Sequence, residues 1–316
     1  MKNFKKFFHG ALCFVKKDGY VIPRRFTLEQ TEIFLNNQFF YDRTLCGASI
    51  TLEFITEAKS FSFDYKFFLR TGVKSTFEVY VDGFLTHIIH DDQILDEGKL
   101  EVDLKDGKKR IEVYIPNYSQ VGIKNLNIDG EYKFVPKRKT KVLFIGDSIT
   151  QGGGARRSGQ TFVDIVKRML DYEIINQGIG GYFCDKNILK DIPFNPQKIV
   201  IGFGTNHRVL EDEENVKVIG EFFNKLCEKY SDKKILVIIP PYYGREQTEF
   251  VRQKYKKIKE IILDSVSKYK NVKTVSAYEM IPHLPEYYLQ DFIHPNGLGM
   301  EVYGQNLVKA IKKLKF

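Results

Sequence analysis

KVLFIGDSITQG, residues 141–152, is a short apolar run that stops at Gly146, followed by a small polar cluster with Ser148 at its centre. Two more glycines come next, and a helical pattern begins near Thr161. This order predicts a buried strand that leads into a tight turn, with the serine near its apex. In an open α/β sheet, ligands bind at the carboxyl ends of the strands, where backbone N–H groups can hold a negatively charged oxygen. Gly-Asp-Ser is also common in ordinary turns, so the segment alone leaves a structural turn and a nucleophile both open.

The composition is that of a globular protein with sizeable cores. The chain has 316 residues, enough for about two domains, and 43% of them are hydrophobic. Its 26 Phe and 18 Tyr indicate mainly buried aromatic residues, with some allowance for a surface that stacks on sugars. The formal charge of +9 comes from scattered lysines without an arginine-rich groove. We therefore expect a solvated basic surface and no nucleic-acid partner.

The cysteines and the apolar runs bear on the compartment. No C-x-x-C spacing occurs, so a zinc site is not expected, and free thiols indicate a reducing compartment. The apolar stretch 10–15 is too short for the core of a signal peptide. No run approaches the roughly 18–20 apolar residues that a membrane-spanning helix needs. We predict a cytoplasmic protein that does not associate with membranes. The four cysteines are Cys13, Cys46, Cys184 and Cys227.

The first part of the chain, residues 1–135, has the pattern of an all-β domain. Apolar and polar residues alternate over 60–67, 77–81 and 111–115, and Asp82-Gly83 is a hairpin signal between two such runs. Further strands are expected over 48–55, 85–90 and 99–104. Short strands separated by turn residues predict a β-sandwich, similar to a jelly roll. Residues 26–35 fit either a short helix or a strand.

Residues 136–140, which include Pro136 and a basic run, are predicted to form a linker, and the pattern changes after them. Apolar strands and amphipathic helices alternate from residue 141 to residue 316, which predicts a parallel sheet with helices on both faces. The expected strands are 142–145, 172–176, 198–203, 235–240 and 272–275. The expected helices are 161–170, 213–230, 249–269 and 298–314.

Three further polar clusters lie just after strands of this second domain or in its last loop. They are 176–181 (NQGIGG), 202–207 (GFGTNH) and 291–297 (DFIHPNG). Each has an ordinary structural interpretation as a turn, a helix cap or a surface loop. In a doubly wound sheet, however, the first two meet at the edge that carries Ser148. That coincidence favours a functional site.

These residue types suit nucleophilic catalysis. A serine hydroxyl is a weak nucleophile that needs an adjacent base, and His294 can accept its proton near neutral pH. Asp291 can hold the other ring nitrogen of His294 and stabilise the imidazolium. An oxyanion hole would be formed by the N–H groups of Ser148 and Gly181 and by the side-chain amide of Asn206.

The four clusters, taken in order, resemble the sequence blocks of the GDSL, or SGNH, hydrolases. Gly-Asp-Ser148 looks like the nucleophile block, and Asn176-x-Gly178-Ile179-x-Gly181 like the second. Gly204-Thr205-Asn206 looks like the third block, and Asp291-x-x-His294-Pro295 like the last. The resemblance covers residues 141–316. It implies a three-layer flavodoxin-like α/β fold, ester hydrolysis through an acyl-enzyme, and neither metal nor cofactor.

Two departures from this family's pattern affect the expected substrate. His207 stands where the family often has Asp, and Gly180-Gly181-Tyr182 stands where it often has Ser-Gly-Asp. We expect both to alter the wall of the pocket. The order of the domains resembles that of the carbohydrate esterases of family 2 type, which favours an O-acetylated sugar or oligosaccharide as substrate. A lysophospholipase or thioesterase, and an inactive sugar-binding protein, remain as alternatives, and the oligomeric state is open.

Overall fold

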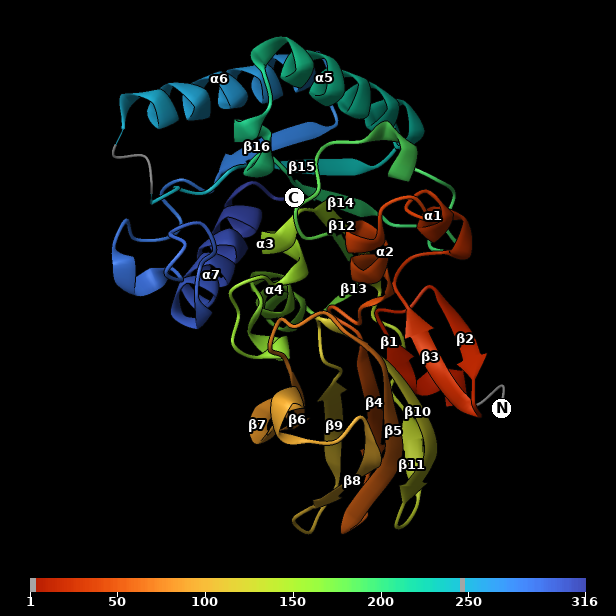
Figure 1. Cartoon of the computed structure of the whole chain (residues 1–316). Helices are drawn as coiled ribbons and strands as arrows, with labels where there is room; N and C mark the ends of the chain where they lie inside the picture. Colours follow the sequence, from red (N-terminus) through yellow and green to blue (C-terminus); the bar gives the residue numbers. More distant parts are fainter. Residues whose placement is uncertain (1–3, 245–247) are drawn as a thin grey trace.

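The computed structural model describes residues 4–244 and 248–316. Its strands form three sheets, two in the first part of the chain and one in the second (Figure 1). None of the helices in these two ranges combines the length and the apolar character that a bilayer-spanning helix requires.

The first part is a β-sandwich, as predicted. One sheet has the order β1-β4-β9-β6-β7, with β11 paired to β4, and the other has the order β2-β3-β10-β5-β8. Their bounds are β1 Phe8–His9, β2 Cys13–Lys17, β3 Tyr20–Arg24, β4 Thr51–Thr56, β5 Ser60–Arg70, β6 Thr76–Val81, β7 Phe84–His90, β8 Glu97–Asp103, β9 Lys109–Tyr114, β10 Ser119–Ile128 and β11 Tyr132–Phe134.

The alternation in β5 explains how the sandwich closes. Phe61, Phe63, Tyr65 and Phe67 all point into the buried cluster between the two sheets. The expected hairpin also forms: Val81 pairs with Phe84, and the two residues between them have positive φ. Asp82 (φ 51°) and Gly83 (φ 84°) thereby provide the backbone twist that a two-residue turn needs.

Two α-helices interrupt the described residues of the first part, so the prediction of a purely β region is incomplete. Residues 26–35 contain α1 (Leu28–Glu32), which begins with a capping box formed by Thr27 and Gln30. A second helix, α2 (Gln38–Leu45), was not predicted. Both lie against the second part of the chain rather than the sandwich (Figure 1), and Phe26 and Phe34 join the hydrophobic core of that second part.

The second part is the predicted α/β unit. Its sheet is parallel and has the order β13-β12-β14-β15-β16. Helices α5 and α6 cover one face, and α4 and α7 cover the other (Figure 1). The bounds are β12 Thr140–Gly146, α3 Ser148–Gln151, α4 Phe162–Leu170, β13 Tyr172–Gly178, β14 Lys198–Gly202, α5 Asp212–Lys229, β15 Lys234–Ile239, α6 Glu249–Val266, β16 Val272–Ser276 and α7 Gly297–Lys313.

A buried group of charged side chains joins the two parts. Glu53 on β4 is fully buried and lies 3.1 Å from the guanidinium of Arg138 and 3.3 Å from the ammonium of Lys167 on α4. Glu173 on β13 lies 2.8 Å from the ring of His9 on β1. Burial opposes ionisation of Glu53, but the surrounding cations hold its pKa well below the usual range. Arg138 belongs to the predicted linker, yet only 8% of its surface is exposed. The division of the chain into domains over 1–135 and 141–316 with a linker between them stays a prediction.

Candidate active site

Ser148 is the first residue of α3, directly after β12 (Figure 1). Asp147 is the N-cap of this short helix, since its side chain accepts a hydrogen bond of 3.0 Å from the N–H of Ile149. The helix ends after one turn at Gly152, which has φ 105°. This turn holds the serine at the carboxyl end of β12, where the sequence predicted it.

Ser148, His294 and Asp291 form a continuous chain of hydrogen bonds. The Ser148 hydroxyl lies 2.7 Å from Nε2 of His294, and Nδ1 of His294 lies 2.6 Å from Oδ2 of Asp291. An ionised carboxylate can only accept, so Nδ1 carries the proton and leaves Nε2 as the acceptor for the serine. The structure therefore brings these three predicted residues together in an order that permits proton transfer from serine to histidine.

Asp291 is held by its own loop as well as by the histidine. Its Oδ1 accepts hydrogen bonds from the N–H groups of Ile293 (2.8 Å) and His294 (3.0 Å). Partial burial favours the neutral acid, but the hydrogen bonds from the His294 ring and these N–H groups outweigh it and lower the pKa of Asp291. The carboxylate is thus ionised near neutral pH and fixed in orientation.

Phe292, between the aspartate and the histidine, has φ 57°, a backbone region that bulky residues rarely occupy. Its carbonyl accepts a hydrogen bond of 2.8 Å from the N–H of Gly244, in the loop after β15. The loop that carries Asp291 and His294 is therefore anchored to a neighbouring loop at a strained position.

The two remaining residues of the expected oxyanion hole follow the strands that flank β12. Gly181 lies in the loop after β13 and has φ 80°, a conformation that glycine adopts without strain. Asn206 follows β14, and its Nδ2 donates a hydrogen bond of 2.9 Å to the carbonyl of Tyr182. One amide hydrogen of Asn206 is thereby used to hold the second loop, which leaves the other for a ligand.

His207 was predicted to alter the wall of the pocket, but its ring turns into the protein interior. Its side chain is fully buried. Nε2 accepts a hydrogen bond of 2.9 Å from the N–H of Cys184, and Nδ1 lies 2.8 Å from Oδ1 of Asn215 on α5. Burial lowers the pKa of His207 to about 4, so the ring is neutral. His207 ties the loops after β13 and β14 together.

Side chains from the first part of the chain form a wall of this site. A Cβ atom on Gly181 would lie 3.0 Å from the ring of Phe39 on α2. The Arg43 guanidinium lies 3.4 Å from the centre of that ring, and 52% of Phe39 is exposed. The Tyr118 hydroxyl lies 3.4 Å from the carbonyl oxygen of Ser148. The site is therefore built from both parts of the chain.

Arg25 holds this wall in place. Its guanidinium is fully buried and donates to the carbonyls of Asn176 and Gly178, at 2.8 and 2.6 Å, and to those of Arg43 and Cys46. It thus joins the end of β13 to the end of α2. Sequence reasoning missed Arg25, Phe39 and Tyr118, because they reach the site through tertiary packing and not through a motif.

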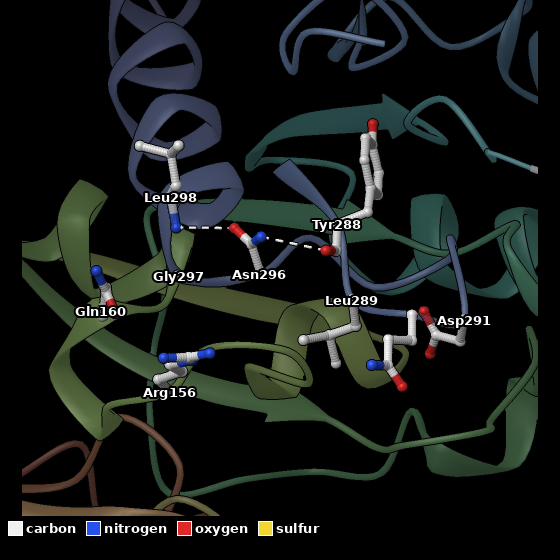
Figure 2. Close-up of a pocket in the computed structure, with 9 residues that line it drawn as sticks. Arg156, Gln160, Tyr288, Leu289, Asp291, Asn296, Gly297 and Leu298 are labelled. Carbon is white, nitrogen blue, oxygen red and sulfur yellow. Dashed lines mark hydrogen bonds between the residues drawn. The ribbon is translucent and has the colours of Figure 1, made fainter. Parts of the chain in front are cut away.

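A groove of about 720 Å³ begins at Asp291 and runs between the segments 156–160 and 288–298. Figure 2 shows Asp291 and Arg156 on opposite sides of Leu289 in this groove. Polar and apolar side chains both line it, and the side chain of Asn296 there caps α7 by accepting a hydrogen bond from the N–H of Leu298. Among residues 4–244 and 248–316, no three His, Cys, Asp or Glu side chains are grouped so that they could hold a metal ion.

Residues 144–302 match the profile of the GDSL-like lipase/acylhydrolase family. No curated protein sequence matches the chain. The fold is similar to that of the salicylyl-acyltransferase SsfX3 from a tetracycline biosynthetic pathway, with a TM-score of 0.77 and 18% sequence identity. The match covers 98% of this chain and 94% of the other. It is also similar to a candidate GDSL-like lipase from Bacteroides ovatus, with a TM-score of 0.75 and 18% sequence identity; the match covers 97% of this chain and 95% of the other. A family two carbohydrate esterase from Clostridium thermocellum, in complex with cellohexaose, gives a TM-score of 0.65 at 16% identity, over 85% of this chain and 93% of the other.

Proposed function

Because the chain belongs to the GDSL-like lipase/acylhydrolase family, we propose that it is a serine esterase in which Ser148, His294 and Asp291 carry out hydrolysis. The observation that carries this proposal is the chain of hydrogen bonds from Asp291 through His294 to the Ser148 hydroxyl, at 2.6 and 2.7 Å. This arrangement supplies the nucleophile, its base and the group that orients the base.

In the proposed reaction, Ser148 Oγ attacks the ester carbonyl while Nε2 of His294 takes its proton. The negative charge on the carbonyl oxygen is stabilised by the N–H groups of Ser148 and Gly181 and by the amide of Asn206. His294 then protonates the leaving alcohol, which leaves an acyl-enzyme on Ser148. Water, deprotonated by His294, releases the acid and restores the serine.

We further propose that the substrate is an O-acetylated carbohydrate and that the enzyme is cytoplasmic. Phe39 supports the first point, because this exposed ring beside Gly181 has one face backed by Arg43 and suits the apolar face of a sugar. The similar fold of carbohydrate esterases gives further support. The cytoplasmic location is supported by the four free cysteines.

An acyl-length series tests the substrate class. We expect kcat/KM to fall from p-nitrophenyl acetate to butyrate to octanoate, and acetate to be released from acetylated xylo-oligosaccharides. Each methylene in an apolar pocket is worth about 1–3 kcal/mol, so a site for long chains would improve steeply toward octanoate. A preference for octanoate without acetate release from any sugar would move the assignment to a lysophospholipase or thioesterase.

The nucleophile is tested by Ser148→Ala, which removes only the hydroxyl oxygen. Turnover of p-nitrophenyl acetate should fall by several orders of magnitude while the circular dichroism spectrum stays unchanged. A purified variant that kept a tenth of the wild-type rate would contradict the role of Ser148. Sugar binding by a wild-type protein that hydrolyses no ester would identify an inactive binding protein instead.

A further inference from the structure

The groove beside Asp291 is lined by polar side chains that form no hydrogen bond within the described residues of the protein. Within the described residues, the side chains of Arg156, Gln160 and Gln290 make no hydrogen bond or ion pair, although all three line this groove. The neighbouring Arg157, in contrast, pairs with the buried Glu78 at 3.6 Å. An arginine without a carboxylate partner in a groove next to a reactive centre is available to a ligand.

The groove lies on the side of the site where the alcohol part of an ester leaves. His294 has to protonate the leaving oxygen, so the alcohol part lies next to its ring. Asp291 is hydrogen-bonded to that ring and forms one end of the groove. A substrate longer than a single sugar would therefore continue past Leu289 toward Arg156 (Figure 2).

We propose that this groove binds the alcohol part of the ester and that Arg156 selects a sugar unit that carries a carboxylate. The inference rests on the proposed esterase function and specifies its substrate as an acetylated acidic oligosaccharide. A planar guanidinium binds a carboxylate through two parallel hydrogen bonds, and Gln160 and Gln290 suit the hydroxyl groups of the same sugar.

The carboxylate of Asp291 lies in the same groove but does not oppose this assignment. Both of its oxygens are already occupied, by the ring of His294 and by two backbone N–H groups. Figure 2 places it across Leu289 from Arg156. An acidic unit bound at Arg156 is therefore separated from Asp291, whereas the acetylated unit, which is neutral, occupies the end near His294.

The test compares three esters: p-nitrophenyl acetate, acetylated xylo-oligosaccharides and acetylated oligogalacturonides. Arg156→Gln should lower kcat/KM on the acidic substrate about 10- to 100-fold, mainly through KM, because a hydrogen bond to a charged group is lost. p-Nitrophenyl acetate, which has no sugar units to place in the groove, should change less than twofold. The neutral oligosaccharide, which offers no carboxylate to Arg156, should change less than the acidic one. Arg156→Lys should fall between wild type and Arg156→Gln on the acidic substrate, because lysine keeps the charge but loses the bidentate geometry.

The control variant Lys312→Gln removes one positive charge from the exposed last turn of α7, at the end of that helix opposite to the groove. It should leave all three rates unchanged, which separates a local contact from the effect of net charge. If wild type hydrolyses the neutral esters but Arg156→Gln has no effect on the acidic one, the inference is refuted and the esterase function stands. If wild type hydrolyses none of the three, both proposals fail.

Discussion

Replacing Asp291 by Asn should damage the site more than replacing it by Ala. In the wild-type protein, Oδ1 of Asp291 accepts two backbone N–H groups and Oδ2 accepts the Nδ1 proton of His294. An asparagine has only one oxygen, and the two backbone donors will hold it. Its NH2 group then faces Nδ1 of His294 and donates to it. The proton of the ring moves to Nε2, which can no longer accept the proton of Ser148.

The magnitude follows from these contacts. The His294 tautomer that can accept the serine proton carries its own proton on Nδ1, and it requires the asparagine oxygen to turn toward the ring. That rotation would lose the two hydrogen bonds from the backbone N–H groups, at about 1 kcal/mol each. The active tautomer therefore costs about 2–3 kcal/mol, or roughly 30- to 150-fold in rate. Either substitution also loses the charge-assisted bond to the imidazolium, worth about 1.5–3 kcal/mol, or roughly 10- to 150-fold. We therefore expect a loss of roughly 10- to 150-fold for Asp291→Ala and, from the product of the two effects, of roughly 300- to 20,000-fold for Asp291→Asn.

The assay is kcat for p-nitrophenyl acetate at pH 7.5, with the unfolding free energy of both variants measured in urea. The stability measurement is needed because the loop over 291–294 depends on the same oxygen. If Asp291→Asn were as active as Asp291→Ala while both variants remained folded, the tautomer argument would be refuted. The proposed role of Asp291 would then reduce to its charge.

Substitutions at three other positions probe separate features of the site. Asn206→Ala should lower kcat for p-nitrophenyl acetate about 100- to 1000-fold with little change in KM, and a change in KM alone would make Asn206 a ground-state contact. The unfolding free energy of Phe292→Gly, measured in urea, should exceed that of Phe292→Ala by about 1 kcal/mol, because only glycine is unstrained at φ 57°. If the alanine variant were the more stable of the two, as at ordinary backbone positions, the backbone at residue 292 would not be strained. Burial raises the pKa of Asp147 from 3.8 to about 6, so the unfolded chain loses this proton at lower pH than the folded protein does. The wild-type unfolding free energy should therefore fall by about 2 kcal/mol from this group as the pH rises from 4 to 6. Asp147→Asn keeps the cap and should lack this fall, and equal slopes in urea titrations of both proteins would contradict it.

The sequence predicted those parts of the fold whose signals are local. Period-two alternation identified β5, and alternating strands and helices identified the parallel sheet. Helix α2 was missed because its aromatic face packs against a part of the chain that lies more than a hundred residues later. The aromatic residues of α2 can be identified as core residues only when their distant partners in the folded chain are known.

The same distinction applies to the site. Ser148, Gly181 and Asn206 were predictable as neighbours, because the carboxyl ends of adjacent parallel strands meet at one edge of the sheet. His207 follows Asn206 directly, yet its ring turns into the protein interior, and no spacing rule separates these two orientations. Phe39 carries no sequence signal at all, since it reaches Gly181 only through the packing of α2.

The buried charges at the junction have a consequence for the modularity of this protein. A hydrolase part that began at residue 141 would keep Lys167 and Glu173 but lose Glu53 and Arg138, their partners across the junction. Breaking a buried ion pair typically costs about 3–5 kcal/mol, a large fraction of the stability of a domain. We therefore expect the two parts to unfold together, and the β-sandwich to be inherited with its enzyme rather than exchanged as an accessory module.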